Sequence, residues 1–152
     1  MGMFGMGSKK SGGLDPATGE YGGDMVSMMK MLGGMPHMMR KPMMKGRITQ
    51  LLSLSEEKRQ ESVRNMIGAF HSSKVNSKTQ ESLVATRVEI VGELPEADRR
   101  TIISSRTQAL KAAPELDNAD QRIQERILPK IAQDTREAFL SSWDYVRKDA
   151  GA

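Results

Sequence analysis

Thioether and cationic side chains are concentrated in one short part of the sequence, residues 25–47. This segment holds nine of the thirteen methionines and five Lys or Arg residues, and it has no Asp or Glu. Thioethers are soft, flexible and polarizable, so they suit irregular apolar partners or Cu(I). The cations favour an acidic partner or an anionic membrane. We therefore expect the function of the chain to depend on what this segment binds.

Docking through this segment would combine apolar burial with ionic contact. So many methionines left exposed would form an apolar patch, which a partner, a second copy of the chain or a membrane should cover. The predicted docking residues are Met25, Met28, Met29, Met31, Met35, Met38, Met39, Met43, Met44, Lys30, Arg40, Lys41 and Lys45. We expect a non-catalytic accessory or scaffolding subunit that binds a larger protein complex, itself or an anionic membrane surface. Gathered copies could shelter a lipophilic molecule.

A Cu(I) site is the alternative use of the same segment. Its thioether and imidazole donors would be Met35, His37, Met38 and Met39. Thioethers are most useful as copper ligands where thiols are unavailable, typically outside the cytosol, and the sequence shows no export signal. We therefore expect no bound cofactor and keep a Cu(I)-binding protein as the second hypothesis.

Residues typical of catalysis are scarce. The chain has no cysteine, which excludes disulfides, thiolate metal sites and cysteine nucleophiles. The two histidines, His37 and His71, belong to no HExxH motif, and neither a G-x-S-x-G nor a P-loop motif occurs. The acidic residues cluster at predicted helix starts, where they complement the helix dipole. We expect that the protein is not an enzyme.

The positive charge belongs to the first 47 residues. All of the formal net charge of +4 arises there, because the rest of the chain has equal numbers of basic and acidic residues. No aromatic residue lies between Lys30 and Arg47, so the base-stacking platforms of nucleic-acid-binding proteins are absent and no specific nucleic acid is expected. No apolar run approaches the roughly 18 residues of a membrane-spanning helix. We expect a cytoplasmic protein, either free or peripheral on the inner face of the membrane.

The sequence divides into an extension and a helical domain. Residues 1–42 are rich in Met and Gly and poor in Leu, Ile and Val, so we expect a basic extension that is largely disordered or partner-bound. Residues 43–149 carry apolar residues at helical spacing, as in the predicted buried stripe Val63, Met66, Ile67 and Phe70. The fold class is therefore all-α, with four to six helices from about Met43.

Glycines and prolines mark the expected helix ends. A short helix should follow Asp24 and end at Gly33-Gly34. Pro36 and Pro42 should break the next ten residues, and Pro129 should kink or split the last helical stretch.

Four arginines suggest an internal repeat. Arg64, Arg87, Arg106 and Arg126 are spaced by 23, 19 and 20 residues, about the length of one helix and one turn. This spacing fits either a short helical repeat or consecutive antiparallel helices in a small bundle. We favour the bundle, because only two units match well and helical repeats generally need three or more. Each arginine is expected to pair with a nearby acidic helix start.

Overall fold

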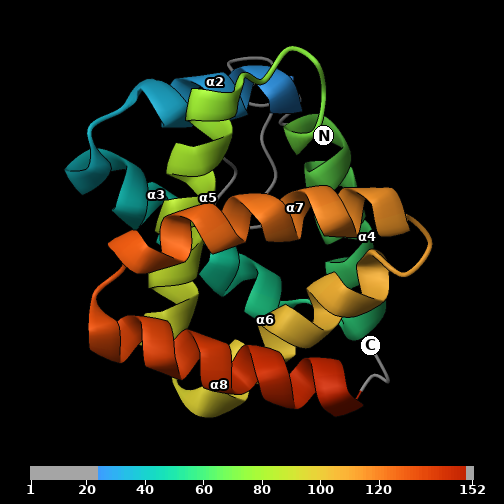
Figure 1. Ribbon diagram of the computed structural model, residues 1–152. Coiled ribbons are helices and arrows are strands. Elements are labelled where there is room, and N and C mark those ends of the chain that lie inside the picture. The colour runs from blue at the N-terminus through green and yellow to red at the C-terminus, as the bar shows by residue number, and fades with distance from the viewer. Residues whose placement is uncertain (1–23, 150–152) are drawn as a thin grey trace.

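The computed structural model describes residues 24–149, which form an all-α fold (Figure 1). The helices are α2 (Met25–Gly34), α3 (His37–Ser53), α4 (Glu56–Phe70), α5 (Ser77–Glu93), α6 (Glu96–Ala109), α7 (Pro114–Ile127), the short 3-10 helix η1 (Leu128–Lys130) and α8 (Gln133–Asp149). Among these residues there is no strand, and no helix is long and apolar enough to cross a membrane. The all-α fold class is confirmed.

Seven α-helices in the described residues exceed the four to six that were predicted. The additional helix is α2, which precedes the domain that was predicted to begin at about Met43. In addition, α3 begins at His37 and continues through Pro42, where a break was expected. Pro42 leaves one carbonyl without its helical N–H, that of Met38. Because Met38 is fully at the surface, water can donate to this carbonyl, and the helix tolerates the proline. The split at Pro129 is confirmed, since η1 separates α7 from α8.

The predicted extension is only partly described. Its residues 1–23 lie outside the described residues. From Met25 on it is helical, and the Asp24 carboxylate accepts an N–H from Val26 at the start of α2. α2 places Met28, Met29 and Leu32 in the hydrophobic core. In this conformation α2 is therefore packed with the rest of the helices.

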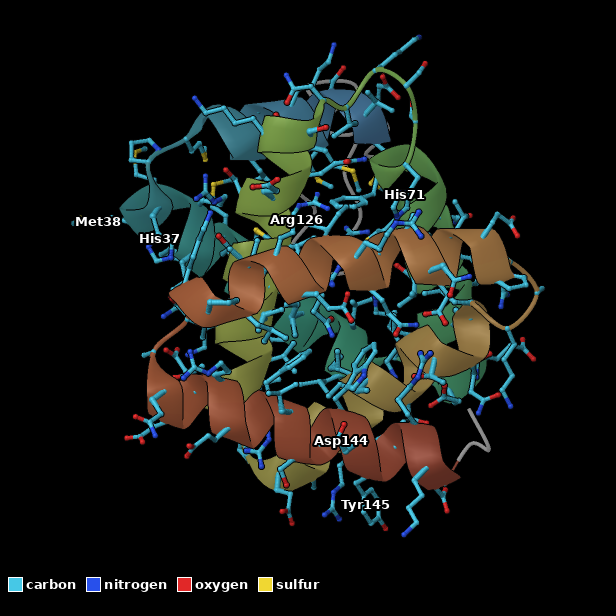
Figure 2. All side chains as sticks on the ribbon, viewed as in Figure 1. His37, Met38, His71, Arg126, Asp144 and Tyr145 are labelled. Atoms are coloured by element: carbon cyan, nitrogen blue, oxygen red, sulfur yellow. The ribbon has the colours of Figure 1, made fainter. Side chains whose placement is uncertain are left out.

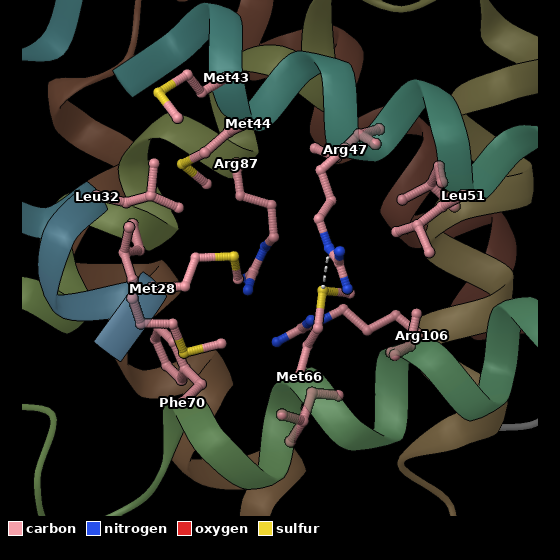
Figure 3. Close-up of a pocket in the computed structure, with 16 residues that line it drawn as sticks. Met28, Leu32, Met43, Met44, Arg47, Leu51, Met66, Phe70, Arg87 and Arg106 are labelled. Carbon is pink, nitrogen blue, oxygen red and sulfur yellow. Dashed lines mark hydrogen bonds between the residues drawn. The ribbon is translucent and has the colours of Figure 1, made fainter. Parts of the chain in front are cut away.

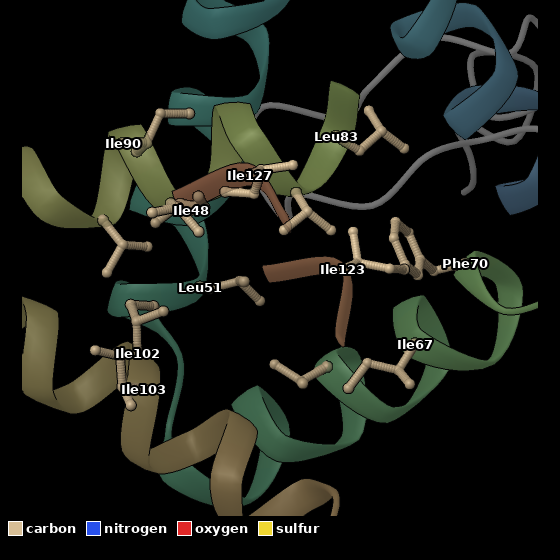
Figure 4. Close-up of a cluster of buried hydrophobic side chains, with 14 of the residues drawn as sticks. Ile48, Leu51, Ile67, Phe70, Leu83, Ile90, Ile102, Ile103, Ile123 and Ile127 are labelled. Carbon is tan, nitrogen blue, oxygen red and sulfur yellow. The ribbon is translucent and has the colours of Figure 1, made fainter. Parts of the chain in front are cut away.

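Helix α5 runs through the centre of the molecule, and α2, α3, α7 and α8 pack around it (Figure 1). Its buried side chains Val84, Val88, Ile90 and Val91 are almost inaccessible to solvent. The surrounding helices contribute mainly isoleucine, leucine and phenylalanine to the same core (Figure 4). The position of α5 thus brings helices from both halves of the chain into one core.

At four of the helix junctions, a buried or half-buried arginine makes the same hydrogen bonds to the main chain. Its Nη1 donates to the main-chain carbonyl five residues earlier and, in three of the four cases, also to the carbonyl eight residues earlier. The carbonyl five residues earlier belongs to the C-cap residue that follows the preceding helix, and the guanidinium supplies a donor for it. The carbonyl eight residues earlier already accepts the N–H of that cap residue, and the guanidinium is its second donor. The four residues are Arg40, Arg59, Arg99 and Arg136.

Three of these arginines also join their junction to a helix far along the chain. In each, Nε donates to a serine or threonine hydroxyl at 2.9 Å. The pairs are Arg40–Thr86 on α5, Arg59–Ser105 on α6 and Arg99–Ser142 on α8. One side chain therefore fixes both a local turn and a distant helix–helix contact.

Equivalent contacts recur at a nearly constant distance along the chain. Arg99 follows Arg40 by 59 residues, and Gly92 follows Gly33 by the same number. A Cβ atom at Gly33 would clash with Thr79 on α5, and one at Gly92 would clash with Thr135 on α8. α2 therefore packs on α5 as α5 packs on α8. By these contacts the α2–α3 junction is equivalent to the α5–α6 junction, so we compare α2–α4 and α5–α7 as two three-helix units.

This repeat differs from the one predicted from sequence. The predicted arginines have unequal surroundings: Arg64 is exposed, Arg126 meets Glu81 near the start of α5, and Arg87 and Arg106 both bind Asp120. The true repeat places an arginine five residues after an apolar residue that ends a helix. The spacing between successive arginines was therefore the wrong feature to compare.

Replacing Arg40 by Met should lower the free energy of unfolding substantially. The change removes three hydrogen bonds, and each buried group left unsatisfied costs roughly 1–3 kcal/mol. The matched control is Arg64→Met at an exposed position, which should change it by less than about 0.5 kcal/mol. Urea unfolding followed by circular dichroism measures both. Equal effects of the two changes would contradict the role of the junction arginine.

Candidate binding site

The methionines of residues 25–44 occupy three different environments. Met28 and Met29 are buried, at 3% and 6% exposure, whereas Met31, Met38 and Met39 are 39%, 85% and 57% exposed. The half-buried group, packed against the core, consists of Met25, Met35, Met43 and Met44. Only the exposed group is accessible to a partner in this conformation, and docking by Met28 or Met29 would require α2 to separate from the core.

The cations of the segment are also divided. Arg40 is buried in the α2–α3 junction, where its guanidinium is engaged by Thr86 and two carbonyls. Lys41 Nζ lies 2.6 Å from Glu89 Oε1 and 3.0 Å from Glu93 Oε1. The hydrogen bond to Glu89 raises the pKa of Lys41, and burial opposes it. Lys30 and Lys45 are exposed and remain available to a partner.

Among the described residues, no contact brings the four side chains of the Cu(I) hypothesis together around a common point. His37 Nε2 lies 3.2 Å from Glu89 Oε1, Met35 packs against the core, and Met38 projects outward beside His37 (Figure 2). Among residues 24–149, no group of three or more His, Asp or Glu side chains is placed to hold a metal ion. Binding of Cu(I) by the thioethers stays a prediction that no observed contact favours.

A cavity of about 130 Å³ lies among helices α2–α6 (Figure 3). Most of its lining is apolar and includes five methionines: Met28, Met29, Met43, Met44 and Met66. Three arginines, Arg47, Arg87 and Arg106, also line it, and within the described part of the chain no Asp or Glu does. Arg47 Nε donates to Met66 Sδ at 3.3 Å. The cavity thus combines adaptable thioether walls with several guanidinium groups.

Behind the cavity, Arg87 and Arg106 share one buried carboxylate. Asp120 accepts two hydrogen bonds from Arg87 and one from Arg106. The shortest polar distance is 2.7 Å, between Arg106 Nη2 and Asp120 Oδ1 of the ion pair. Burial alone would raise the pKa of Asp120, but the charges of Arg106 and Arg87 outweigh it and hold that pKa far below its usual range. Burial, aided by the charge of Arg106, lowers the pKa of Arg87 to about 10. Two cations therefore face one anion in this cluster.

The sequence predicted that Arg87 and Arg106 would each pair with an acidic helix start, but it did not predict that both would share the buried Asp120 carboxylate. A signal for it exists on α7. Asp120 precedes Ile123 and Ile127 at helical spacing, so it stands on the apolar stripe of that helix. An acidic residue on such a stripe must meet a buried cation.

Comparison with known proteins identifies no relative. No protein-family model matches the chain, and no curated protein and no solved structure is detectably similar to it. Its function is therefore inferred from the chemistry of its own side chains.

Replacing Asp120 by Asn should strongly destabilise the fold. The amide keeps the shape but leaves two buried guanidiniums without a carboxylate, and removing one partner of a buried ion pair typically costs about 3–5 kcal/mol. Asp144→Asn on the exposed face of α8 is the matched control, expected to change stability by less than about 0.5 kcal/mol. The measurement is the urea midpoint at neutral pH. A midpoint for Asp120→Asn equal to that of the control would show that the cluster does not need the carboxylate.

His71 should make stability depend on pH. Burial lowers the pKa of His71, while the charges of Asp120, Arg106 and Arg87 oppose one another, and its Nε2 is buried with no hydrogen-bond partner among the described residues. A His pKa that is lower in the folded state means that the unfolded chain binds more protons, so stability is complete above about pH 6.5 and falls as the pH decreases below it.

The urea midpoint at pH 7.5 and pH 5.5 measures this dependence. The wild-type midpoint should fall at the lower pH. His71→Gln removes the titrating group and should reduce that fall. An unchanged difference between the two pH values in the variant would assign the dependence to other groups.

Proposed function

We propose that this chain is a non-catalytic accessory or scaffolding subunit that docks to a larger protein assembly through Met31, Met38 and Met39. The supporting observation is that three of the four large apolar side chains exposed among residues 24–149 belong to α2 and the first turn of α3. Burial of one such side chain contributes about 1.5–3 kcal/mol when it is complete. Three together can supply much of the free energy of a specific association.

A protein partner is favoured over an anionic membrane by the division of the cations. Lys30 and Lys45 are exposed, whereas Arg40 is engaged inside the fold and Lys41 is paired with two glutamates. Each cation near an anionic membrane contributes about 1 kcal/mol, so two provide weak attachment. Apolar contact would then carry most of the binding, and thioethers adapt well to an apolar groove on a protein.

The surroundings of the two histidines support a binding role over catalysis. The recorded contact of the His37 imidazole is with Glu89 at the surface, and the His71 ring packs edge-on against Phe70 at a centroid distance of 4.8 Å. No serine or threonine hydroxyl is recorded as hydrogen-bonded to either ring within residues 24–149, so a nucleophile–base pair of the usual kind has no basis there.

Changing Met31, Met38 and Met39 together to Ser should abolish association with the partner. These side chains make the apolar contact in the proposal, and they are exposed, so the fold should keep its thermal midpoint. The matched control is Tyr145→Ser, which removes the fourth exposed large apolar side chain on α8 and should leave association intact. Quantitative pull-down from native extract and sedimentation velocity measure binding to other proteins and to itself.

Changing Lys30 and Lys45 together to Gln separates the two kinds of surface. On a protein partner this should mainly slow association and weaken its salt dependence. On vesicles with anionic lipid it should release the protein, because little other attraction to the surface remains. Loss of vesicle binding in the lysine variant, with protein association unaffected by the methionine changes, would overturn the proposal.

A further inference from the structure

The first turn of α3 is held against α5 through one of its sides. His37 Nε2 lies 3.2 Å from Glu89 Oε1, and Lys41 Nζ lies 2.6 Å from the same oxygen. Between these two residues, Arg40 Nε donates to Thr86 Oγ1 at 2.9 Å. Both acceptors belong to α5. Residues three and four apart lie on one face of a helix, so positions 37, 40 and 41 all face α5.

Met38 and Met39 are therefore turned away from α5. Successive residues of a helix are rotated by roughly 100° about its axis, which places these two side chains outside the face that contacts α5. Met38 is the most exposed large apolar side chain among residues 24–149, and Met39 is the next. Figure 2 shows Met38 projecting outward beside His37. Because the turn is pinned to α5 at three positions, both thioethers stay exposed while the fold is intact.

The methionines of this part of the chain differ in how easily an oxidant reaches them. Oxidation of a thioether uses a sulfur lone pair, so the oxidant must touch the sulfur atom. Met28 and Met29 on α2 are buried in the core, which excludes it. Met38 and Met39 follow them by ten residues and expose their thioethers to solvent. An oxidant dissolved in water therefore meets the second pair and not the first.

We propose that Met38 and Met39 form a redox-sensitive site whose substrate is a hydroperoxide, and that their oxidation to sulfoxides lowers the affinity of the docking surface for an apolar partner. With hydrogen peroxide, a sulfur lone pair attacks one oxygen atom and the O–O bond breaks. The departing hydroxide takes the proton of the transferred hydroxyl group. The thioether thus loses two electrons and gains one oxygen, and the peroxide is reduced to water. A dithiol reductant reverses the change and yields the thioether, a disulfide and water.

Oxidation at these positions changes the surface and leaves the core as it is. A sulfoxide is polar, whereas a thioether is apolar. In contact with an apolar partner the sulfoxide oxygen loses water and gains no hydrogen bond, which opposes binding. The sulfur atoms of Met38 and Met39 lie outside the hydrophobic core, so the thermal midpoint should not change. This effect on docking rests on the proposed function, in which both side chains contact the partner.

Site-resolved oxidation of the full chain is the first measurement. The protein is treated with hydrogen peroxide at neutral pH, and mass spectrometry of its peptides follows each methionine. Met38 and Met39 should be oxidised about tenfold or more faster than Met28 and Met29, because a buried thioether reacts only when the fold opens. In urea above the unfolding midpoint the difference should disappear. Equal rates in the folded protein would contradict the proposed site.

Retention on a phenyl-substituted resin is the second measurement, because the resin is an apolar surface of known chemistry. Oxidation of the full chain should weaken its binding to the resin by about tenfold, since each sulfoxide brings an unsatisfied polar atom into the contact. Dithiothreitol together with the two methionine sulfoxide reductases, one for each sulfoxide epimer, should restore the retention. Unchanged retention after oxidation of both residues would refute the effect on the surface.

Met38→Leu and Met39→Leu together remove both sulfur atoms and keep apolar side chains. Each protein is compared with itself before and after peroxide, so its starting retention does not enter the result. The double variant should lose the response to peroxide. The matched control is Met25→Leu, which removes a half-buried thioether of α2 and should keep the wild-type response. A full response in the double variant would assign the effect to other methionines and exclude this site.

Failure of the redox site and failure of the docking role give different results. The oxidation rates and the resin retention are measured without any protein partner, so they decide the redox site alone. The docking role is decided by association of the serine variant of Met31, Met38 and Met39. An oxidised chain that keeps its retention, beside a serine variant that loses association, would leave docking in place and remove the redox site.

Discussion

Helix ends are the constraint on which this structure depends. The last carbonyls of a helix have no partner in the helix, and a chain that turns sharply inside a protein cannot leave them to water. Here a guanidinium from the next helix donates to them, as Arg40, Arg59 and Arg99 do. The same guanidinium reaches a hydroxyl 43 to 46 residues further along the chain. Turn geometry and helix packing are thus determined by one planar group whose donors have fixed directions.

This arginine contact recurs at several helix junctions, and these junctions form a frame in which individual positions can change without loss of the fold. One junction arginine and one close-packed glycine recur in both units, as Arg40 with Gly33 and as Arg99 with Gly92. The interior is less regular: Arg87, Arg106 and Asp120 form an ion cluster, and a cavity with mostly apolar walls lies beside it. Helices of both units line this cavity, so the candidate site lies where the two units meet.

Periodicity was sufficient to predict the fold class. The stripe containing Val63, Ile67 and Phe70 is buried as its spacing indicated. The helix count was too low because α2 lies in the predicted extension and was not counted with the domain. Pro42 was wrongly taken as a break, since a proline is tolerated where the carbonyl it leaves is exposed to water. The repeat was missed for a different reason. Its signal is an arginine that follows two apolar residues at the end of the preceding helix, by five and by eight residues. The spacing between successive arginines does not show this pattern.

The environments of the methionines could not be predicted from sequence. Met28 and Met31 lie on one short helix, yet the first is buried and the second is exposed. Which side of α2 faces the core is decided by its packing on α5, where Gly33 meets Thr79. That contact involves residues 46 positions apart, beyond the reach of local pattern. From composition we expected the segment to bind a partner, but only the packing separates its buried methionines from its accessible ones.

The central position of α5 has a consequence for how the molecule unfolds. This helix is the first of the second unit and also the surface on which α2 and α3 of the first unit pack. Neither unit has a complete core without it. Many repeat proteins lose their terminal repeats one by one, since each repeat contacts only its neighbours. Because α5 contributes to the cores of both units, opening of either one exposes the interior of the other. We therefore expect the described helices to unfold as a single cooperative unit.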